Sequence, residues 1–340
     1  MSPTNRPNLV SVVAPAKLNL YFDILGKRED NYHEIITVFQ AIDLQDVLTF
    51  NFTQIDTGLS NKIEISLTQK PDYIESDLFP LDDDCSIAQA TKIFLAAMPS
   101  KPSVNLKVEV EKNIPIGAGL AGGSTDAAAT LIALNHFFNN PFTEIKLVNL
   151  ASQIGSDVAF CIIGGKAIGR GRGEQLEKMV SNNQYNFIVV KPRSISVSTP
   201  WAYKAYDQFI RSEIIEEIKP HSISNILLAL KFKADIEKQS KYFWNAFEEV
   251  ICKEYPILAE IKNELLKLGC ITAHLTGSGP TIYGLIENAD EGKVILGKLE
   301  KIVFKNPNAK DFAHNQIIID AWLTKTIDQG AHILLSKNSG

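Results

Sequence analysis

Residues 115–126 read PIGAGLAGGSTD, and an apolar run with helical character, AAATLIALNHFF, follows at 127–138. The segment contains four glycines within seven residues: Gly117, Gly119, Gly122 and Gly123. Residues without a Cβ let consecutive backbone N–H groups converge on an anion, and the positive end of the following helix dipole adds to the attraction. The pattern therefore predicts a loop that cradles a phosphate group, and a nucleotide phosphate is the expected ligand.

Two other phosphate loops and a turn without a ligand compete with this interpretation. The segment contains GxGxxG, but the preceding run VNLKVEVE (104–111) alternates apolar and polar residues, whereas the strand of a dinucleotide-binding unit is apolar on both faces. The ribose-binding acid expected about 20 residues further on would fall near Glu144, where PFTEIKLVNLASQI has helical spacing. No Lys precedes Ser124, which removes the Walker A loop. A glycine-rich turn capped by Ser124 stays open as the alternative without a ligand.

Composition places the chain among globular proteins. Its 340 residues, 45% of them hydrophobic, are enough for about two domains with their own cores. The net charge is −5 and no Lys/Arg block interleaves with aromatic residues, so no nucleic-acid partner is expected. Four scattered cysteines without a CxxC pair argue against a zinc site and a disulfide framework. Because neither a signal-like start nor a membrane-length apolar run is found, we expect a cytoplasmic protein without membrane contact, with an organelle reached through a removed transit peptide as the open alternative. The expected oligomeric state is a monomer or weak homodimer.

The pattern of apolar residues predicts mainly strands before the glycine loop and helices after it. The expected elements of the first half are strand material at 11–25 broken at Pro15, short strands within 35–50 and at 62–68, a helix at 86–97, and a helix after the loop that ends at Asn139. The polar run SNNQY at 181–185 predicts a domain boundary, with one domain over 9–182 and another over 186–325.

The second half opens with a fresh strand, FIVVKP. Helices are expected at about 241–253 and 256–268, and ITAHLTGSGPTIYGLI reads as two strands joined by a turn at Gly277–Gly279. This succession predicts an α+β fold with two domains.

The glycine loop resembles the phosphate loop of the GHMP kinases, a family named for galactokinase, homoserine kinase, mevalonate kinase and phosphomevalonate kinase. Pro115 to Thr125 follow its pattern, with Thr125 in place of a second Ser. Four further strings occur in the order of one branch of that family: PAKLNL (15–20), NYHEI (31–35), IGSDVAF (154–160) and TGSGPTIYG (276–284). That branch phosphorylates the tertiary 2-hydroxyl of a cytidine-diphosphate-linked methylerythritol in the non-mevalonate isoprenoid pathway.

The resemblance implies a fold and two nucleotide ligands. The N-terminal domain would contain a left-handed βαβ crossover, and the C-terminal domain would be ferredoxin-like. ATP would bind with Mg²⁺, for which Ser124 is a candidate ligand, and the acceptor would be the cytidine-diphosphate substrate. The residues that the resemblance assigns to ATP are Pro115, Ile116, Gly117, Ala118, Gly119, Leu120, Ala121, Gly122, Gly123, Ser124 and Thr125.

Lys17 and Asp157 are the candidate catalytic residues. Taken alone, Asp157 is equally well read as a helix N-cap and Lys17 as a charged residue that protects an edge strand. The resemblance makes Asp157 the general base and Lys17 the cation that orients it and stabilises developing charge. Asn19, two residues on, shares the strand face of Lys17 and is a candidate substrate contact.

The candidate cytosine pocket comes from two separate segments. By resemblance, Tyr32 would stack on the base and His33 would read its edge, while Thr199 would bind substrate and Tyr203 would form the opposite stacking wall. Residues Gly277–Gly279 either form a simple hairpin turn or approach the phosphates from the second domain.

Some features depart from the family pattern, and other functions stay open. Cys85 follows Asp84 where the family has Asn, and the extra residues at about 52–62 and beyond 325 have no assigned role. The alternatives are a GHMP kinase acting on another small alcohol, of the mevalonate or homoserine type, and a nucleotide-binding module without catalysis.

Overall fold

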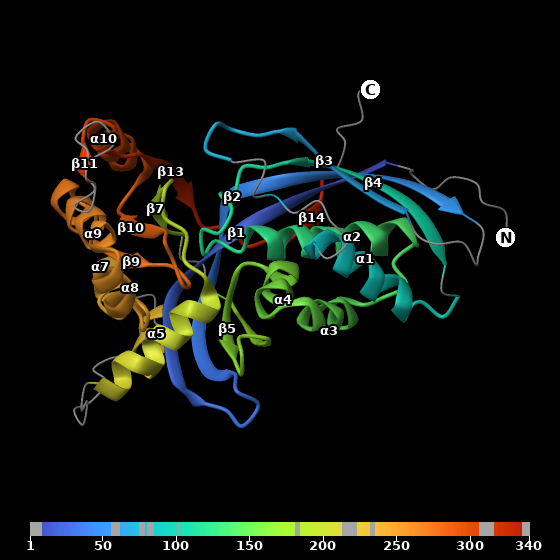
Figure 1. Ribbon diagram of the computed structural model, residues 1–340, viewed down its shortest axis with the longest axis horizontal. Coiled ribbons are helices and arrows are strands. Elements are labelled where there is room, and N and C mark those ends of the chain that lie inside the picture. Colours follow the sequence, from blue (N-terminus) through green and yellow to red (C-terminus); the bar gives the residue numbers. More distant parts are fainter. Residues whose placement is uncertain are drawn as a thin grey trace.

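The computed structural model describes residues 9–55, 62–74, 79, 85–100, 102–180, 184–212, 223–231, 235–305 and 316–334. In Figure 1 a long twisted sheet with helices beneath it fills one half of the molecule, and a smaller sheet with its own helices fills the other. Within the described residues, no helix is both long and apolar enough to cross a membrane.

The larger sheet is built on two long strands, β1 (Leu9–Lys27) and β2 (His33–Ile55), which pair antiparallel along most of their length. The strand order is β14-β1-β2-β4-β3, with β5 beside β2, β6 beside β5, and β8 beside β1. The other strands are β3 (Lys62–Gln69), β4 (Ser103–Glu111), β5 (Lys166–Arg170), β6 (Gln175–Met179), β8 (Trp244–Asn245) and β14 (His332–Ile333).

The strand break expected at Pro15 was wrong, because β1 continues through it. Its pairing with β2 changes register between Pro15 and Ala16, which marks a β-bulge or irregularity. Proline lacks the N–H that a strand ladder needs, so a bulge is a place where a strand tolerates it.

Helices cover one face of the larger sheet (Figure 1): α1 (Ser86–Ala97), α2 (Gly122–Phe137), α3 (Glu144–Ile154) and α4 (Ser156–Ile163). Helix α1 has the bounds that its apolar spacing predicts. The core between helices and sheet is apolar and includes the stacking of Phe52 on Phe137 at 4.3 Å. This rigid layer fixes the start of α2, where the glycine loop ends.

The crossover that the resemblance predicts is found between β3 and β4. These strands are parallel neighbours, and α1 lies between them in the chain. Parallel neighbours need such a connection, since a tight turn can join only antiparallel strands. Its left-handed form stays a prediction.

The smaller sheet contains β7 (Asn186–Pro192), β9 (Thr272–Leu275), β10 (Ile282–Ile286) and β13 (Ile319–Lys325). Its order is β13-β7-β10-β9, and every neighbouring pair is antiparallel. With helices after the first and third strands, this is the split βαββαβ arrangement of a ferredoxin-like domain. The remaining elements are α5 (Thr199–Ser212), α6 (Ile223–Lys231), α7 (Ile236–Ser240), α8 (Glu248–Glu254), α9 (Pro256–Leu268), α10 (Ala289–Leu299), β11 (Phe304–Lys305) and β12 (Gln316–Ile317).

The helix expected at 241–253 is shorter than its sequence suggests. Only α8 is helical there, and residues 244–245 form β8, which pairs in parallel with β1. The side chain of Asn245 donates to the carbonyls of Leu275 and Gly277, so tertiary contacts override the helical pattern. The helix expected at 256–268 is confirmed as α9.

Segments from the end of the chain return to the larger sheet. Strand β14 pairs with β1 at Val12 and Val13, which gives the residues beyond 325 a structural role. Of the extra residues near 52–62, those at 56–61 lie outside the described part, as do 181–183 of the predicted boundary run. The two domain ranges stay predictions.

Candidate active site

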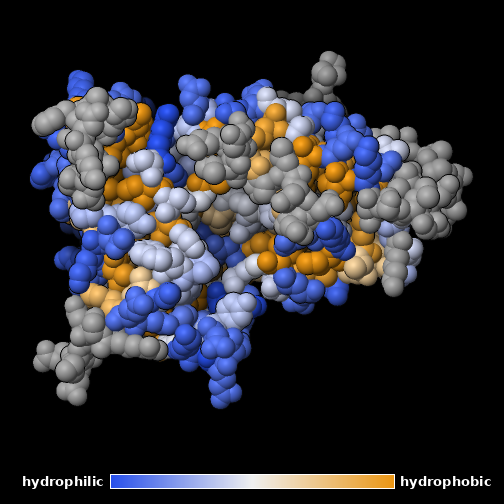
Figure 2. Space-filling model, in the orientation of Figure 1, coloured by the Kyte–Doolittle hydropathy of each residue, from blue (hydrophilic) through white to orange (hydrophobic). Residues whose placement is uncertain are grey.

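A cavity of about 770 Å³ lies where the two halves meet, and Figure 2 shows this face hollowed between them. Side chains from β1, the glycine loop, α4, α5 and the 276–280 loop line it. The sequence-predicted residues that line this cavity are Lys17, Asn19, Tyr32, His33, Gly117, Ala118, Gly119, Ala121, Gly122, Gly123, Ser124, Asp157, Thr199 and Tyr203. Segments that are distant in sequence therefore meet at one place.

Four of the residues assigned to ATP do not line the large cavity. Pro115 and Ile116 line a smaller cavity of about 70 Å³, which shares Gly117, Gly122 and Gly123 with the large one. Leu120 and Thr125 are fully buried.

The glycine loop has the backbone of an anion cradle. Gly117 and Gly119 have φ of +62° and +76°, and Ala121 is left-handed as well. Helix α2 begins at Gly122, earlier than the apolar run suggests, so its first N–H groups point back into the loop. Ser124 lies in that first turn and faces the cavity. A phosphate would meet backbone donors, the helix dipole and a hydroxyl together.

The loop between β9 and β10 packs directly on the glycine loop. A Cβ at Gly119 would lie 2.5 Å from the carbonyl oxygen of Thr276, and one at Gly277 would lie 3.1 Å from the carbonyl oxygen of Gly119. Ser278 faces the cavity and hydrogen bonds to Thr199 across 2.9 Å. The turn at 277–279 is therefore both a hairpin and a wall of the cavity.

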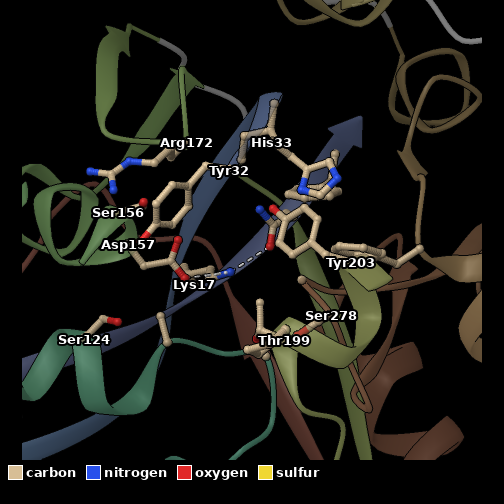
Figure 3. Close-up of a pocket in the computed structure, with 18 of the residues that line it drawn as sticks. Lys17, Tyr32, His33, Ser124, Ser156, Asp157, Arg172, Thr199, Tyr203 and Ser278 are labelled. Carbon is tan, nitrogen blue, oxygen red and sulfur yellow. Dashed lines mark hydrogen bonds and ion pairs between the residues drawn. The ribbon is translucent and has the colours of Figure 1, made fainter. Parts of the chain in front are cut away.

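Lys17 and Asp157 meet at the centre of the cavity. Lys17 Nζ lies 3.3 Å from Asp157 Oδ2 and donates to Asn19 Oδ1 at 2.8 Å. Figure 3 shows the pair between Ser124 and the aromatic side chains of the pocket. Asp157 is not an N-cap: Gly155 occupies that position, and Asp157 lies in the first turn of α4. A buried cation beside a reachable carboxylate suits proton transfer from a hydroxyl.

Aromatic side chains form the far end of the cavity. The imidazole of His33 stacks on Tyr203 with centroids 4.6 Å apart and planes inclined by 16°. Tyr32 is 56% exposed, and the guanidinium of Arg172 lies 4.9 Å from its ring centroid. In this structure His33, rather than Tyr32, covers the face of Tyr203.

Sequence reasoning missed several polar residues that line the cavity: Lys27, Arg172, Lys204 and Asp207. Of these residues, Asp207 was the most predictable from the sequence, because it lies four residues after Tyr203 and thus on the same face of a helix. Arg172 sits in the turn GRGRGE, where the sequence gives no such signal. These residues make the aromatic end more charged than expected.

A buried ion cluster anchors the glycine loop from below. Lys112 Nζ lies 2.5 Å from Asp46 Oδ2 and 2.7 Å from Asp126 Oδ2, and all three side chains are almost fully buried. Asp46 Oδ1 also accepts from the backbone N–H groups of Asn113 and Ile114. Burial raises the pKa of Asp126 above its usual value, against the attraction of Lys112. The cluster ties the start of α2 to β2 and to the end of β4.

Metal-ligating side chains do not cluster within the described part of the chain. No group of three or more His, Cys, Asp and Glu side chains among the described residues could hold a metal ion. Ser124 lines the cavity, and its role as a Mg²⁺ ligand stays a prediction. Asp84 lies outside the described part of the chain, whereas Cys85 is the N-cap of α1, its sulfur accepting from the N–H of Ala88 at 3.4 Å.

Comparisons with known proteins agree with this geometry. The GHMP kinases N terminal domain matches residues 86–165, and the GHMP kinases C terminal domain matches residues 229–306. The chain is 34% identical over 293 residues to 4-diphosphocytidyl-2-C-methyl-D-erythritol kinase of Acaryochloris marina, covering 84% of this chain and 90% of that one. It is 35% identical over 289 residues to the kinase of the same name from Clostridium kluyveri, covering 85% and 95%.

A solved structure extends the likeness to three dimensions. A crystal structure of 4-(cytidine 5'-diphospho)-2C-methyl-D-erythritol kinase superposes with a TM-score of 0.68 at 26% identity, covering 93% of this chain and 98% of that one. The chain therefore belongs to the GHMP kinases and, within them, to the family of 4-diphosphocytidyl-2-C-methyl-D-erythritol kinases.

Proposed function

We propose that this protein transfers the γ-phosphoryl group of ATP to the 2-hydroxyl of 4-diphosphocytidyl-2-C-methyl-D-erythritol. The observation that carries the proposal is the Lys17–Asp157 pair, 3.3 Å apart, at the junction of a phosphate-binding loop and an aromatic pocket. The names of the relatives support this acceptor, and the cavity has the glycine loop at one end and aromatic side chains at the other.

The ATP phosphates would lie along the glycine loop. Residues 117–119 and 121–123 line that position, the N-terminus of α2 lies beside it, and Ser124 adds a hydroxyl. Mg²⁺ bound to the phosphates would neutralise charge that develops on their oxygens. The tight contact between Gly119 and the 276–280 loop would hold the cradle in place during transfer.

Asp157 would accept the proton of the acceptor hydroxyl. As the hydroxyl oxygen forms its bond to the γ-phosphorus, the bond from that phosphorus to the bridging oxygen breaks and ADP leaves. Lys17, buried behind the carboxylate and held by Asn19, would orient Asp157 and stabilise charge on the transferred group. Loose transition states need little early deprotonation, so orientation of the hydroxyl is part of the same role.

The cytidine end of the acceptor would occupy the aromatic end of the cavity. Tyr32 has an exposed ring, His33 has an edge at the cavity with Tyr203 stacked on its face, and Thr199 hydrogen bonds to Ser278 at the cavity wall. Base stacking on aromatic rings is worth about 1–3 kcal/mol per base in single-stranded nucleic-acid sites, a fair guide to this pocket.

The deciding experiment measures ATP consumption with 4-diphosphocytidyl-2-C-methyl-D-erythritol, with mevalonate, with homoserine and without an acceptor. We expect turnover with the cytidylyl acceptor alone, and competition by CMP against it. Turnover with mevalonate or homoserine would move the protein to another GHMP activity. ATP binding with no turnover on any acceptor would make it a nucleotide-binding module.

A further inference from the structure

Asp207 on α5 faces the aromatic end of the cavity and has no part in the proposed phosphoryl transfer. Its Oδ1 lies 2.7 Å from Nε2 of His33, a residue 174 positions away in sequence. Its Oδ2 lies 3.2 Å from Nζ of Lys27. The carboxylate of Asp207 therefore lies between the imidazole of His33 and the ammonium group of Lys27, where it can fix the orientation of that imidazole.

The His33 ring is fixed in two ways. Its face stacks on Tyr203, which is itself held edge-to-face by Phe247 with centroids 4.9 Å apart and planes at 81°. Its rotation within that plane is set by the hydrogen bond to Asp207. One ring edge is thereby directed at Asp207, and Nδ1 is left on the other side of the ring.

The charge of Asp207 determines what Nδ1 can do. Although partial burial opposes the effect, hydrogen bonds from His33 and Lys27 lower the pKa of Asp207 below its usual value. An ionised carboxylate only accepts hydrogen bonds, so Nε2 must carry the proton. In a neutral imidazole the second nitrogen is then an acceptor. None of the described residues hydrogen bonds to Nδ1, and His33 lines the cavity.

We propose that Asp207 is a specificity-determining positioning residue, which fixes His33 so that Nδ1 accepts a hydrogen bond from the 4-amino group of cytosine. Uracil carries a carbonyl oxygen at the same position, which would face the Nδ1 lone pair without a proton between them. An acceptor left unpaired in this way is expected to weaken binding by roughly 10- to 100-fold. The inference rests on the proposed function, since it takes the cytidylyl group as the ligand of this pocket.

The first test is binding of CDP and UDP to the full chain, measured by titration calorimetry at neutral pH. The wild type should bind CDP roughly 10- to 100-fold more tightly than UDP. In Asp207→Asn the amide can donate to Nε2, which places the proton on Nδ1, so the preference should shrink to a few-fold or reverse. Asp207→Glu keeps the carboxylate and should restore part of the preference. Asp320→Asn breaks an exposed ion pair with Arg193 on the smaller sheet. It is the matched control and should bind CDP and UDP as the wild type does.

The second test separates positioning from folding. Long-range ¹H–¹⁵N spectra report which nitrogen of an imidazole carries the proton, and comparison with His33→Gln assigns the signal among the six histidines. We expect an Nε2–H tautomer in the wild type and a mixed or reversed one in Asp207→Asn. In turnover with the cytidylyl acceptor, Asp207→Asn should raise KM for that acceptor while kcat and KM for ATP stay nearly constant.

The outcomes distinguish this inference from the proposed function. A wild type that prefers CDP, together with an Asp207→Asn protein that keeps the full preference, would overturn the inference and leave the kinase function standing. An Nδ1–H tautomer or a doubly protonated ring in the wild type would overturn it too, even if the Asn variant did not fold. A wild type that neither prefers CDP nor phosphorylates the cytidylyl acceptor would overturn the function itself.

Discussion

Lys17 Nζ lies 3.3 Å from Asp157 Oδ2, but the two side chains differ sharply in exposure, at 4% and 34%. The ammonium group sits behind the carboxylate, on the central strand β1, and Asp157 reaches into the cavity from the first turn of α4 (Figure 3). Hydrogen bonds from Lys17 and Thr276 to Asn19 link this pair to the second domain. Of the pair, the carboxylate of Asp157 is therefore the group more open to the cavity.

Substitution of Asp157 by Asn should lower turnover by roughly 10²- to 10⁴-fold, the usual range for a general base. Lys17→Met should cost a similar factor, and the double variant should be little worse than either single one, because residues that act as a unit are not additive. Steady-state kinetics with the cytidylyl acceptor measures all three. Asp290→Asn, which breaks an exposed ion pair with Lys293, serves as the control. Near-normal turnover of a folded Asp157→Asn protein would remove the base role.

The contact between the glycine loop and the 276–280 loop should be sensitive to a single added methyl group. Gly119→Ala would bring a Cβ to 2.5 Å from the Thr276 carbonyl oxygen at a φ of +76°, so the loops must separate. We expect KM for ATP to rise at least about ten-fold, because the cradle loses the geometry that positions its N–H groups. Gly297→Ala is the matched control: its Cβ would meet nothing within 4 Å, and it lies in α10, where Ala is stabilising by up to about 1 kcal/mol. Equal KM values in the two variants would contradict the expected role of the contact.

Local patterns predicted the regular elements of this chain well. The alternation of residues 104–111 gave strand β4, whose Val104, Leu106, Val108 and Val110 are buried. Helices α1 and α9 have the bounds that apolar spacing predicts, and α2 ends just before Asn139 and Asn140, both left-handed. In these segments local propensity and tertiary packing favour the same structure.

Long-range contacts account for what the sequence did not predict. Residues 241–247 have a helical pattern, but β8 pairs with β1 and Asn245 bonds two carbonyls of a distant loop. Asp207 reaches His33 across 174 positions, and no single-sequence signal connects them. The shared strand face of Lys17 and Asn19 was predictable because the period of a strand is local, whereas the approach of Asp157 depends on the packing of α4.

Removing Lys112, the cation of the buried cluster beneath the glycine loop, should lower the free energy of unfolding. Lys112→Met would leave Asp46 and Asp126 buried without a counter-charge, and breaking a buried pair in this way costs about 3–5 kcal/mol. Urea unfolding monitored by circular dichroism measures the loss. Adding Asp126→Asn should recover part of the stability, because it removes one of the two stranded carboxylates. A Lys112→Met protein as stable as the wild type would show that the carboxylates are protonated or hydrated at no cost.

Glu248 should govern the acid stability of the second domain. It accepts from the N–H of Leu275 at 2.8 Å, is bonded by Lys262, and lies 3.3 Å from His274 Nδ1. Burial would raise its pKa, but His274 and Lys262 prevail and lower it from 4.5 to about 2. The folded-state pKa is below the unfolded one, so the stabilisation is present above pH 4.5 and is lost as pH falls toward 2.

The expected contribution of Glu248 is about 3 kcal/mol, since each pKa unit corresponds to about 1.4 kcal/mol. The unfolding free energy of the wild type should therefore fall steeply between pH 4.5 and 2, and that of Glu248→Gln should start lower and fall less over the same range. Glu264→Gln, which breaks the surface pair with Lys267, should leave the profile of the wild type unchanged. Chemical unfolding at a series of pH values measures the three curves, and parallel curves for wild type and Glu248→Gln would mean that other carboxyl groups set the acid limit.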